Sequence, residues 1–192
     1  MKNNLTDNGI YIDIGCNHPT KINNTYKFYR HGYKGICIDA NIEFTNLYKL
    51  FRSRDFFLQI GVGCKPELKY FYKSITPVIS RFENHDKSKP DFFNKAELIP
   101  IFPLNEILKV FSIDYVFLLS IDVEGMNIDV LKGAKNILNK TFILIIEFED
   151  AIERKSILNE LLNYNFMLVA ETHCNLILVN NSYNFDKLNK RQ

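Results

Sequence analysis

Five short apolar runs separated by amphipathic stretches constrain the fold of this 192-residue chain more than any other feature. Each run has the length of a buried strand. The stretches between them place apolar residues on one helical face, as Phe44, Leu47 and Phe51 show. This alternation is typical of a mostly parallel sheet with helices on both faces. The strands are predicted at 10–14, 34–39, 56–61, 115–121 and 142–148, and the helices at 24–31, 44–51, 105–111, 128–139 and 151–164.

The last two apolar runs, 166–171 and 176–179, are joined by a very short link. Such a link permits an antiparallel hairpin but not a parallel crossover. We therefore predict one α/β domain over residues 1–192, with its core at about 10–180. Its sheet is expected to have seven strands, mostly parallel, and to end in this C-terminal antiparallel hairpin.

The stretch 75–97 has no apolar periodicity and contains Pro77 and Pro90. After a short strand predicted at 68–72 we expect a long loop here, and long loops in compact domains are usually functional. The loop is a candidate lid or acceptor-binding segment. Its phenylalanines either stack on a bound ring or anchor the loop to the core, and its basic residues could contact acidic groups; these are Phe82, Phe92, Phe93, Arg81, His85 and Lys87.

Charge and composition argue against several classes of protein. Lys plus Arg number 24 and Asp plus Glu 22, which leaves a net charge of +2 and no basic stripe, so we expect no nucleic-acid partner. No apolar run is long enough to span a bilayer, and the first residues lack the apolar core of a secretory signal. The cysteines form no CxxC pair, which favours a reduced protein in the cytoplasm over a disulfide scaffold or a zinc site; they are Cys16, Cys37, Cys64 and Cys174.

The first predicted strand ends in an acidic residue, a glycine and a polar residue, which are Asp13, Gly15 and Asn17. A glycine at this place lets the backbone approach a cofactor closely at the carboxyl edge of the sheet. The GxGxxG fingerprint of dinucleotide-binding proteins is absent, because Gly15 is the only glycine of the turn. The alternative interpretation is a turn that only ends the strand, with glycine supplying a positive φ.

The second predicted strand ends in Asp39, 24 positions after Gly15. A carboxylate at this place can accept hydrogen bonds from both ribose hydroxyls of a cofactor that contains adenosine. The alternative is an aspartate that caps the helix following it. Together the two strand-end signals are more specific than either one.

A third strand end carries two carboxylates, Asp122 and Glu124, directly before Gly125. Burying two acids beside an apolar strand costs free energy unless they serve a ligand, a metal ion or a helix N-terminus. Glu147 ends the next predicted strand and is either a further acid at the same edge or an exposed residue. Charge stabilisation of a helix N-terminus is the alternative reading for Glu124.

Several segments together resemble the FkbM family of methyltransferases. They are DIGCNHP, NNTYKFYRHGYKGICIDAN, LLSIDVEGMNIDVLKGA and IIEFE, and the resemblance runs from about residue 11 to 179. The NHP…NNT segment is similar to the branch found with bacterial surface-glycan genes. Five αβ units closed by a hairpin also match a Rossmann-like methyltransferase fold better than a plain dinucleotide-binding fold. The sequence departs from the family at Cys16, where a small alanine is more usual.

The resemblance implies S-adenosylmethionine as cofactor and O-methylation as the usual activity. It places Asp122 and Glu124 at the reacting centre. It also assigns the cofactor contacts by position: the methionine side to Asp13, Gly15 and Asn17, the ribose to Asp39 and Ala40, and the adenine to Gly61 and Val62.

Methyl transfer to a hydroxyl needs a positioned acceptor and a group that removes its proton. Asp122, Glu124 and His18 are the candidate bases, although a histidine in a loop is more often structural. Alternatively, Asp122 and Glu124 hold Mg²⁺, which would orient and acidify acceptor hydroxyls. We expect the acceptor to be a sugar, a sugar nucleotide or a glycan. The rival classes are an NAD(P)-binding Rossmann oxidoreductase and a non-catalytic protein that binds S-adenosylmethionine.

Overall fold

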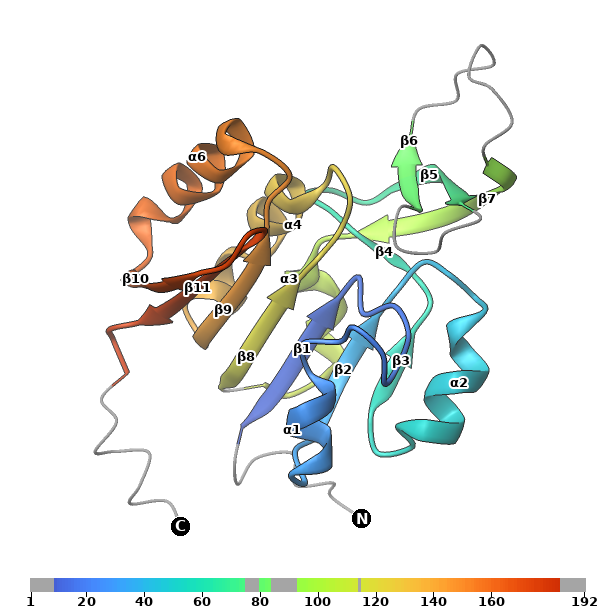
Figure 1. The fold of residues 1–192 in the computed structure, drawn as a ribbon, viewed down its shortest axis with the longest axis horizontal. Helices are drawn as coiled ribbons and strands as arrows, with labels where there is room; N and C mark the ends of the chain where they lie inside the picture. The colour runs from blue at the N-terminus through green and yellow to red at the C-terminus, as the bar shows by residue number, and fades with distance from the viewer. Residues whose placement is uncertain (1–8, 75–79, 84–92, 114, 184–192) are drawn as a thin grey trace.

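A seven-stranded sheet forms the centre of the protein in a computed structural model that describes residues 9–74, 80–83, 93–113 and 115–183 (Figure 1). The strand order is β10-β11-β9-β8-β1-β2-β3. The five strands from β9 to β3 pair in parallel, and β11 pairs antiparallel with both β9 and β10. The predicted fold class and the C-terminal hairpin are therefore confirmed. The bounds are β1 Ile10–Ile14, β2 Gly35–Ile38, β3 Phe56–Leu58, β8 Val116–Ile121, β9 Thr141–Glu147, β10 Phe166–Glu171 and β11 Asn175–Asn180.

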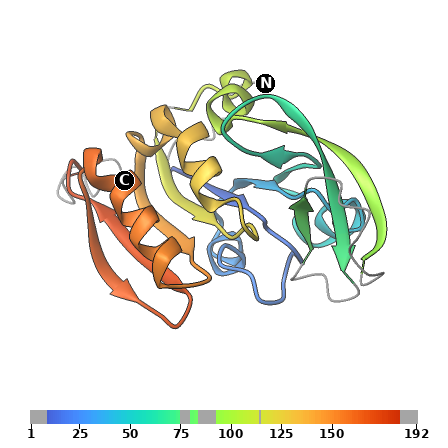
Figure 2. The same ribbon diagram turned by 90° about the horizontal axis from the view of Figure 1, so that it is seen from above.

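Helices cover both faces of this sheet, as the view from above shows (Figure 2). Successive side chains of a strand point to opposite faces, so Ile12 and Ile14 pack on one side while Tyr11 packs on the other. The first side carries the larger core, which is built with α3 Leu104–Ile107, α4 Asn127–Gly133, α5 Lys135–Leu138 and α6 Ala151–Glu160. The second side is covered by α1 Tyr26–Arg30 and α2 Phe44–Phe51.

A second sheet of four strands, which the sequence analysis did not predict, stands beside the carboxyl end of β2 and β3 (Figure 1). Its order is β4-β7-β5-β6, with bounds β4 Gly61–Val62, β5 Glu67–Ser74, β6 Arg81–Glu83 and β7 Phe93–Phe102. The side chains of Phe71, Ile99 and Ile101 are buried on its inner side. This arrangement places aromatic residues next to the edge of the main sheet where the sequence motifs lie.

Two sequence predictions for this region are wrong. The third strand does not run over 56–61: it ends at Leu58, and Gly61 starts a strand that pairs with Ile101 in the second sheet. The stretch 75–97 is not one loop, because residues 81–83 and 93–97 belong to strands. The local pattern missed both because the pairing partners are distant in sequence. The predictions for Phe92, His85 and Lys87 lie outside the described residues.

The predicted helices occur at the expected places. The helix α2 has the predicted bounds 44–51, and the others are shorter. The stretch 128–139 divides into α4 and α5 at Ala134, whose φ of −107° and ψ of 9° are not helical. The helix predicted at 105–111 is the short α3 followed by a 3₁₀ turn. All four cysteines are free, and Cys16 and Cys37 are buried. Among the helices described, none is both long and apolar enough to cross a membrane.

Candidate active site

The turn after β1 lies directly against the end of β8. Asp122 donates its backbone N–H to the carbonyl of Ile14 over 2.9 Å. Gly15 has a φ of +74°, and a Cβ atom there would lie 1.8 Å from the carbonyl oxygen of Asp122. Glycine is therefore required both by the backbone conformation and by the close approach. The first and third sequence motifs form one continuous edge.

The second motif is bonded to the first. The Asp39 carboxylate accepts the backbone N–H of Asn17 through Oδ2 and that of Asn41 through Oδ1, each over 2.8 Å. Asn17 has a φ of 47°, in the left-handed region that asparagine tolerates. Asp39 does not cap α2, whose N-cap residue is Glu43. Burial raises the pKa of Asp39 to about 6, although its two backbone donors oppose this shift.

These residues line a pocket of about 390 Å³ between the carboxyl edge of the main sheet and the second sheet. Predicted residues from all three motifs and from β4 contribute to it. Its lining combines carboxylates with apolar side chains, which is the usual composition of a small-molecule site. The predicted residues in the lining are Gly15, Asn17, Asp39, Ala40, Gly61, Val62, Asp122 and Glu124.

Asp122 lies beside Glu147 in this pocket. Strands β8 and β9 pair in parallel with Ile121 opposite Ile146, so the residues that follow are neighbours. Asp122 is exposed to solvent, although its carboxyl is partly desolvated. This desolvation, with a hydrogen bond to Glu147 and the negative charge of that residue, raises the pKa of Asp122 to about 8. Asp122 is therefore able to hold a proton near neutral pH.

Two predicted residues do not line the pocket. Asp13 is only 3% exposed and accepts the hydroxyl of Thr25 over 2.6 Å, beneath the turn that faces the pocket. His18 is half-buried, and its Nδ1 accepts the backbone N–H groups of Thr20 and Lys21. Burial, with the charge of Lys21, lowers the pKa of His18. Both residues therefore make contacts within the turn.

Phe82, a ring-stacking candidate of the stretch 75–97 in the sequence, lines the pocket together with apolar residues that the sequence pattern did not indicate. Phe71 and Phe82 enter it from the second sheet, with their ring centroids 5.1 Å apart. A Cβ atom on Gly61 would lie 2.8 Å from Cζ of Phe82, so the glycine leaves room for that ring. Ile22 also lines the pocket, although its side chain is 94% exposed and its φ of 46° is unusual for a β-branched residue. No sequence signal marked Phe71 or Ile22.

The described part of the chain contains no obvious set of metal ligands. There, no group of three or more His, Cys, Asp or Glu side chains is arranged to hold an ion. Asp122 and Glu124 both face the pocket, so the suggestion that they hold Mg²⁺ stays a prediction. Gly125 donates its backbone N–H to the Glu149 carboxylate over 3.0 Å, which ties this turn to the end of β9.

The fold and the pocket together define a class. A mostly parallel sheet that ends in an antiparallel hairpin, with a glycine turn and strand-end carboxylates at its carboxyl edge, is the arrangement of Rossmann-like methyltransferases. The sequence pattern of the methyltransferase FkbM domain matches residues 13–173. The chain therefore belongs to the FkbM family of S-adenosylmethionine-dependent methyltransferases.

A solved structure of a methyltransferase domain is also similar to this chain. It is the METTL16 MTase domain (crystal form 2), which aligns over 92% of this chain and 61% of that chain with a TM-score of 0.43 and 11% sequence identity. This chain thus spans less than two thirds of the length of that domain. So distant a likeness says nothing about acceptor or residue roles. Among curated protein sequences, none matches the chain.

Proposed function

We propose that this chain is an O-methyltransferase that transfers the methyl group of S-adenosylmethionine to a hydroxyl of a sugar, a sugar nucleotide or a glycan. The observation that carries the proposal is the pocket in which the Gly15 turn, the Asp39 carboxylate and the Asp122–Glu147 pair face one space. Family membership supports the cofactor. The acids in the pocket lining support a hydroxyl as acceptor.

The pocket residues suit the three parts of the cofactor. Each carboxylate oxygen of Asp39 accepts one hydrogen bond from a backbone N–H. Each oxygen has a further lone pair that can accept a hydrogen bond from a ribose hydroxyl. Ala40, Phe71 and Phe82 form an apolar cluster beside Asp39, which suits an adenine ring. Gly15 and Asn17 then face the methionine part. S-adenosylmethionine, when bound, supplies an activated methyl group for displacement by an oxygen.

Asp122 is the proposed general base. A sugar hydroxyl attacks poorly until its proton is removed, and positioned bases typically contribute ~10²–10⁴-fold. A carboxylate whose pKa is about 8 accepts a proton far more readily than an ordinary aspartate does. Glu147 keeps that pKa high, and Glu124 lies in the same lining, where it accepts a hydrogen bond from the acceptor. His18 has no part in this mechanism, because its described contacts lie within the turn.

A carbohydrate acceptor is supported by the chemistry of the pocket and by the charge of the chain. Asp122, Glu124 and Glu147 offer several acceptor oxygens in one lining, and a sugar presents hydroxyl donors at that density. A net charge of +2 leaves little electrostatic attraction for a run of phosphates. The glycan context of the similar family branch agrees with this choice.

Two experiments test the proposal. Calorimetric titration with S-adenosylmethionine, S-adenosylhomocysteine and NADH separates a methyltransferase from an oxidoreductase; binding of NADH alone would refute the proposal. Incubation with methyl-labelled cofactor and separate pools of sugar nucleotides, polysaccharide, RNA and protein then identifies the acceptor. Label mainly in RNA or protein would refute the carbohydrate acceptor, and cofactor binding without any transfer would indicate a non-catalytic binding protein.

A further inference from the structure

Residues 15–24 form one wall of the pocket without being a helix or a strand. Gly15, Asn17 and Ile22 supply that wall, and all three have a positive φ. Left-handed backbone at two non-glycine residues persists only when surrounding contacts hold it in place. The shape of this segment, here called the cofactor turn, therefore depends on interactions outside the pocket.

The side chain of Asn23 ties the cofactor turn together from within. Its Nδ2 donates to the carbonyl of Cys16 over 2.8 Å, which closes the turn. Its Oδ1 accepts the backbone N–H groups of Thr25 and Tyr26, over 3.0 and 2.8 Å, where α1 begins. The same oxygen accepts a hydrogen bond from Arg52 over 3.0 Å. Asn23 therefore links the turn, the start of α1 and a buried cation.

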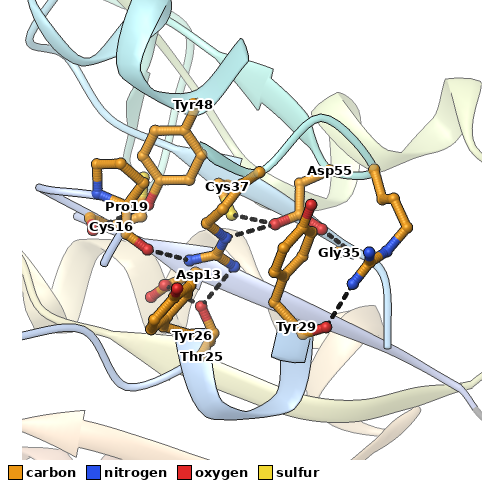
Figure 3. Close-up of polar contacts among 12 residues, drawn as sticks. Asp13, Cys16, Pro19, Thr25, Tyr26, Tyr29, Gly35, Cys37, Tyr48 and Asp55 are labelled. Atoms are coloured by element: carbon orange, nitrogen blue, oxygen red, sulfur yellow. Dashed lines mark hydrogen bonds and ion pairs between the residues drawn. The ribbon is translucent and has the colours of Figure 1, made fainter. Parts of the chain in front are cut away.

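The side chain of Arg52 is fully buried. Its hydrogen-bond partners Pro19, Thr25 and Asp55 are among the residues labelled in Figure 3. Nε donates to Asp55 over 2.7 Å, and one terminal nitrogen donates to Tyr11 and Thr25, each over 2.9 Å. The other terminal nitrogen donates to Asn23 and to the carbonyl of Pro19. All five N–H donors of the guanidinium thus have acceptors, and two of the acceptors belong to the cofactor turn.

Arg52 also links the cofactor turn to α2. It is the C-cap residue of α2, the helix that follows Asp39 and the end of β2. Asp39 holds the cofactor turn at the pocket surface through the N–H of Asn17, and Arg52 holds it from below through Asn23. Thr25, which accepts from Arg52, donates in turn to the buried Asp13. The ionic network therefore reaches the first sequence motif from the side that faces away from the pocket.

We propose that Arg52 is a positioning residue for cofactor binding, which acts through Asn23 to fix the cofactor turn. Asp55 and Tyr11 accept from only two of the five N–H donors of the buried cation. The other donors also need acceptors, and two of those acceptors, Pro19 and Asn23, belong to the cofactor turn that forms a wall of the pocket. The hydrogen-bond partners of Arg52 described above do not themselves line the pocket, and the inference rests on the proposed binding of S-adenosylmethionine in this pocket.

Arg52→Lys is the decisive variant, because lysine keeps a cation beside Asp55 but lacks the planar fork that reaches five acceptors. We expect its dissociation constant for S-adenosylmethionine, measured by calorimetry, to rise at least tenfold. The KM for S-adenosylmethionine should rise similarly, while the KM for the acceptor stays within twofold. Arg54→Lys is the matched control: Arg54 is exposed on the same turn and bonds the carbonyl of Tyr29, so this variant should bind as the parent does.

Asn23→Ala tests the same link from the other side without leaving a buried charge unpaired. It should weaken cofactor binding at least fivefold, and the double variant should bind no more than twofold more weakly than the weaker single variant, because both changes break one link. Asn23→Ala decides the matter if Arg52→Lys fails to fold in a thermal melt. Folded variants that bind within twofold of the parent would overturn the positioning role alone. A parent protein that does not bind S-adenosylmethionine would overturn the proposed function and this inference together.

Discussion

The carboxylate of Asp39 accepts the backbone N–H of Asn17 over 2.8 Å, so two turns 22 residues apart form one surface. This bond crosses from the end of β2 to the end of β1, whose strands are parallel neighbours. It fixes Asn17 in its left-handed conformation and orients the carboxylate towards the pocket. The affinity for a cofactor should therefore depend on the Asp39 side chain in two ways. Asp39 would contact the cofactor directly, and it also holds the turn at Asn17 in place.

Replacing Asp39 by alanine should weaken binding of S-adenosylmethionine by about 1–3 kcal/mol, because both ribose hydrogen bonds are lost. Calorimetry at pH 7.5 measures the change. Glu106→Ala, which removes an exposed acid far from the pocket lining, is the control and should leave the dissociation constant unchanged. An Asp39→Ala protein that binds as tightly as the parent would contradict the assignment.

The stability of the unliganded protein should respond to the pH through Asp39. Its pKa of about 6 lies above the ordinary aspartate value, so the folded state binds this proton more tightly than the unfolded state does. Its contribution to the free energy of unfolding is therefore fully present below about pH 4 and is lost as the pH rises through about 6. In thermal melts, lowering the pH from 7.5 to 5 should stabilise Asp39→Asn less than it stabilises the parent. Equal differences in the two proteins would show that the pKa is not raised.

Methyl transfer should accelerate as the pH rises through about 8, because only ionised Asp122 can accept the proton of the acceptor. Asp122→Asn should lower kcat/KM at least tenfold, about 1.4 kcal/mol of barrier, and remove this pH dependence. Glu124→Gln should lower the rate by a similar factor but keep the pH profile. Unchanged rates in both variants, with an unchanged thermal melt, would exclude the catalytic roles.

A metal-dependent reaction makes a different prediction for the same carboxylates. If Asp122 and Glu124 hold Mg²⁺, EDTA should abolish turnover and added Mg²⁺ should restore it. Under the general-base mechanism, activity should stay within twofold of the untreated protein in EDTA. The assay is run with S-adenosylmethionine at saturation, so that a change in cofactor affinity does not mimic metal loss.

Replacing Phe82 by alanine should weaken cofactor binding by about 1–3 kcal/mol if its ring stacks on adenine. The ring lies against Gly61 and Phe71 at the pocket, so its removal opens the apolar part of the lining. Phe56→Ala is the control, because that ring is partly exposed and packs on Phe111 away from the pocket lining. Equal affinities of Phe82→Ala and the parent would assign adenine to other residues.

Ile22 should be replaceable by asparagine with a gain in stability. The left-handed region costs an L-residue roughly 1–2 kcal/mol, and asparagine tolerates it better than a β-branched residue does. Ile22→Asn should therefore raise the free energy of unfolding by about 1 kcal/mol in urea denaturation. Ile42→Asn, at another exposed isoleucine without a positive φ, should bring no gain. A destabilised Ile22→Asn would mean that the isoleucine makes a contact that outweighs its strain.

The sequence by itself determined the main sheet and most of the carboxyl-edge pocket. Fully apolar runs of strand length identify strands that are buried on both faces, and a parallel arrangement brings the residues that follow those strands to one edge. For that reason Gly15, Asp39, Asp122 and Glu124 could be assigned to one site before any contact was known. Strand length and chain order are local properties, and local properties can be read from a sequence.

Only the tertiary structure decided the second sheet, the burial of Asp13 and the position of Arg52. Gly61 pairs with Ile101, 40 residues further along the chain, and a local sequence pattern cannot predict so distant a pairing partner. Arginine is rarely buried, so Arg52 at the end of an amphipathic helix looks like a surface residue until Asp55, Asn23 and Thr25 surround it. Burying a charge is favourable only when its partners are already in place. Asp55 is close to Arg52 in sequence, but the fold brings Tyr11 of β1 and the stretch 19–25 to it.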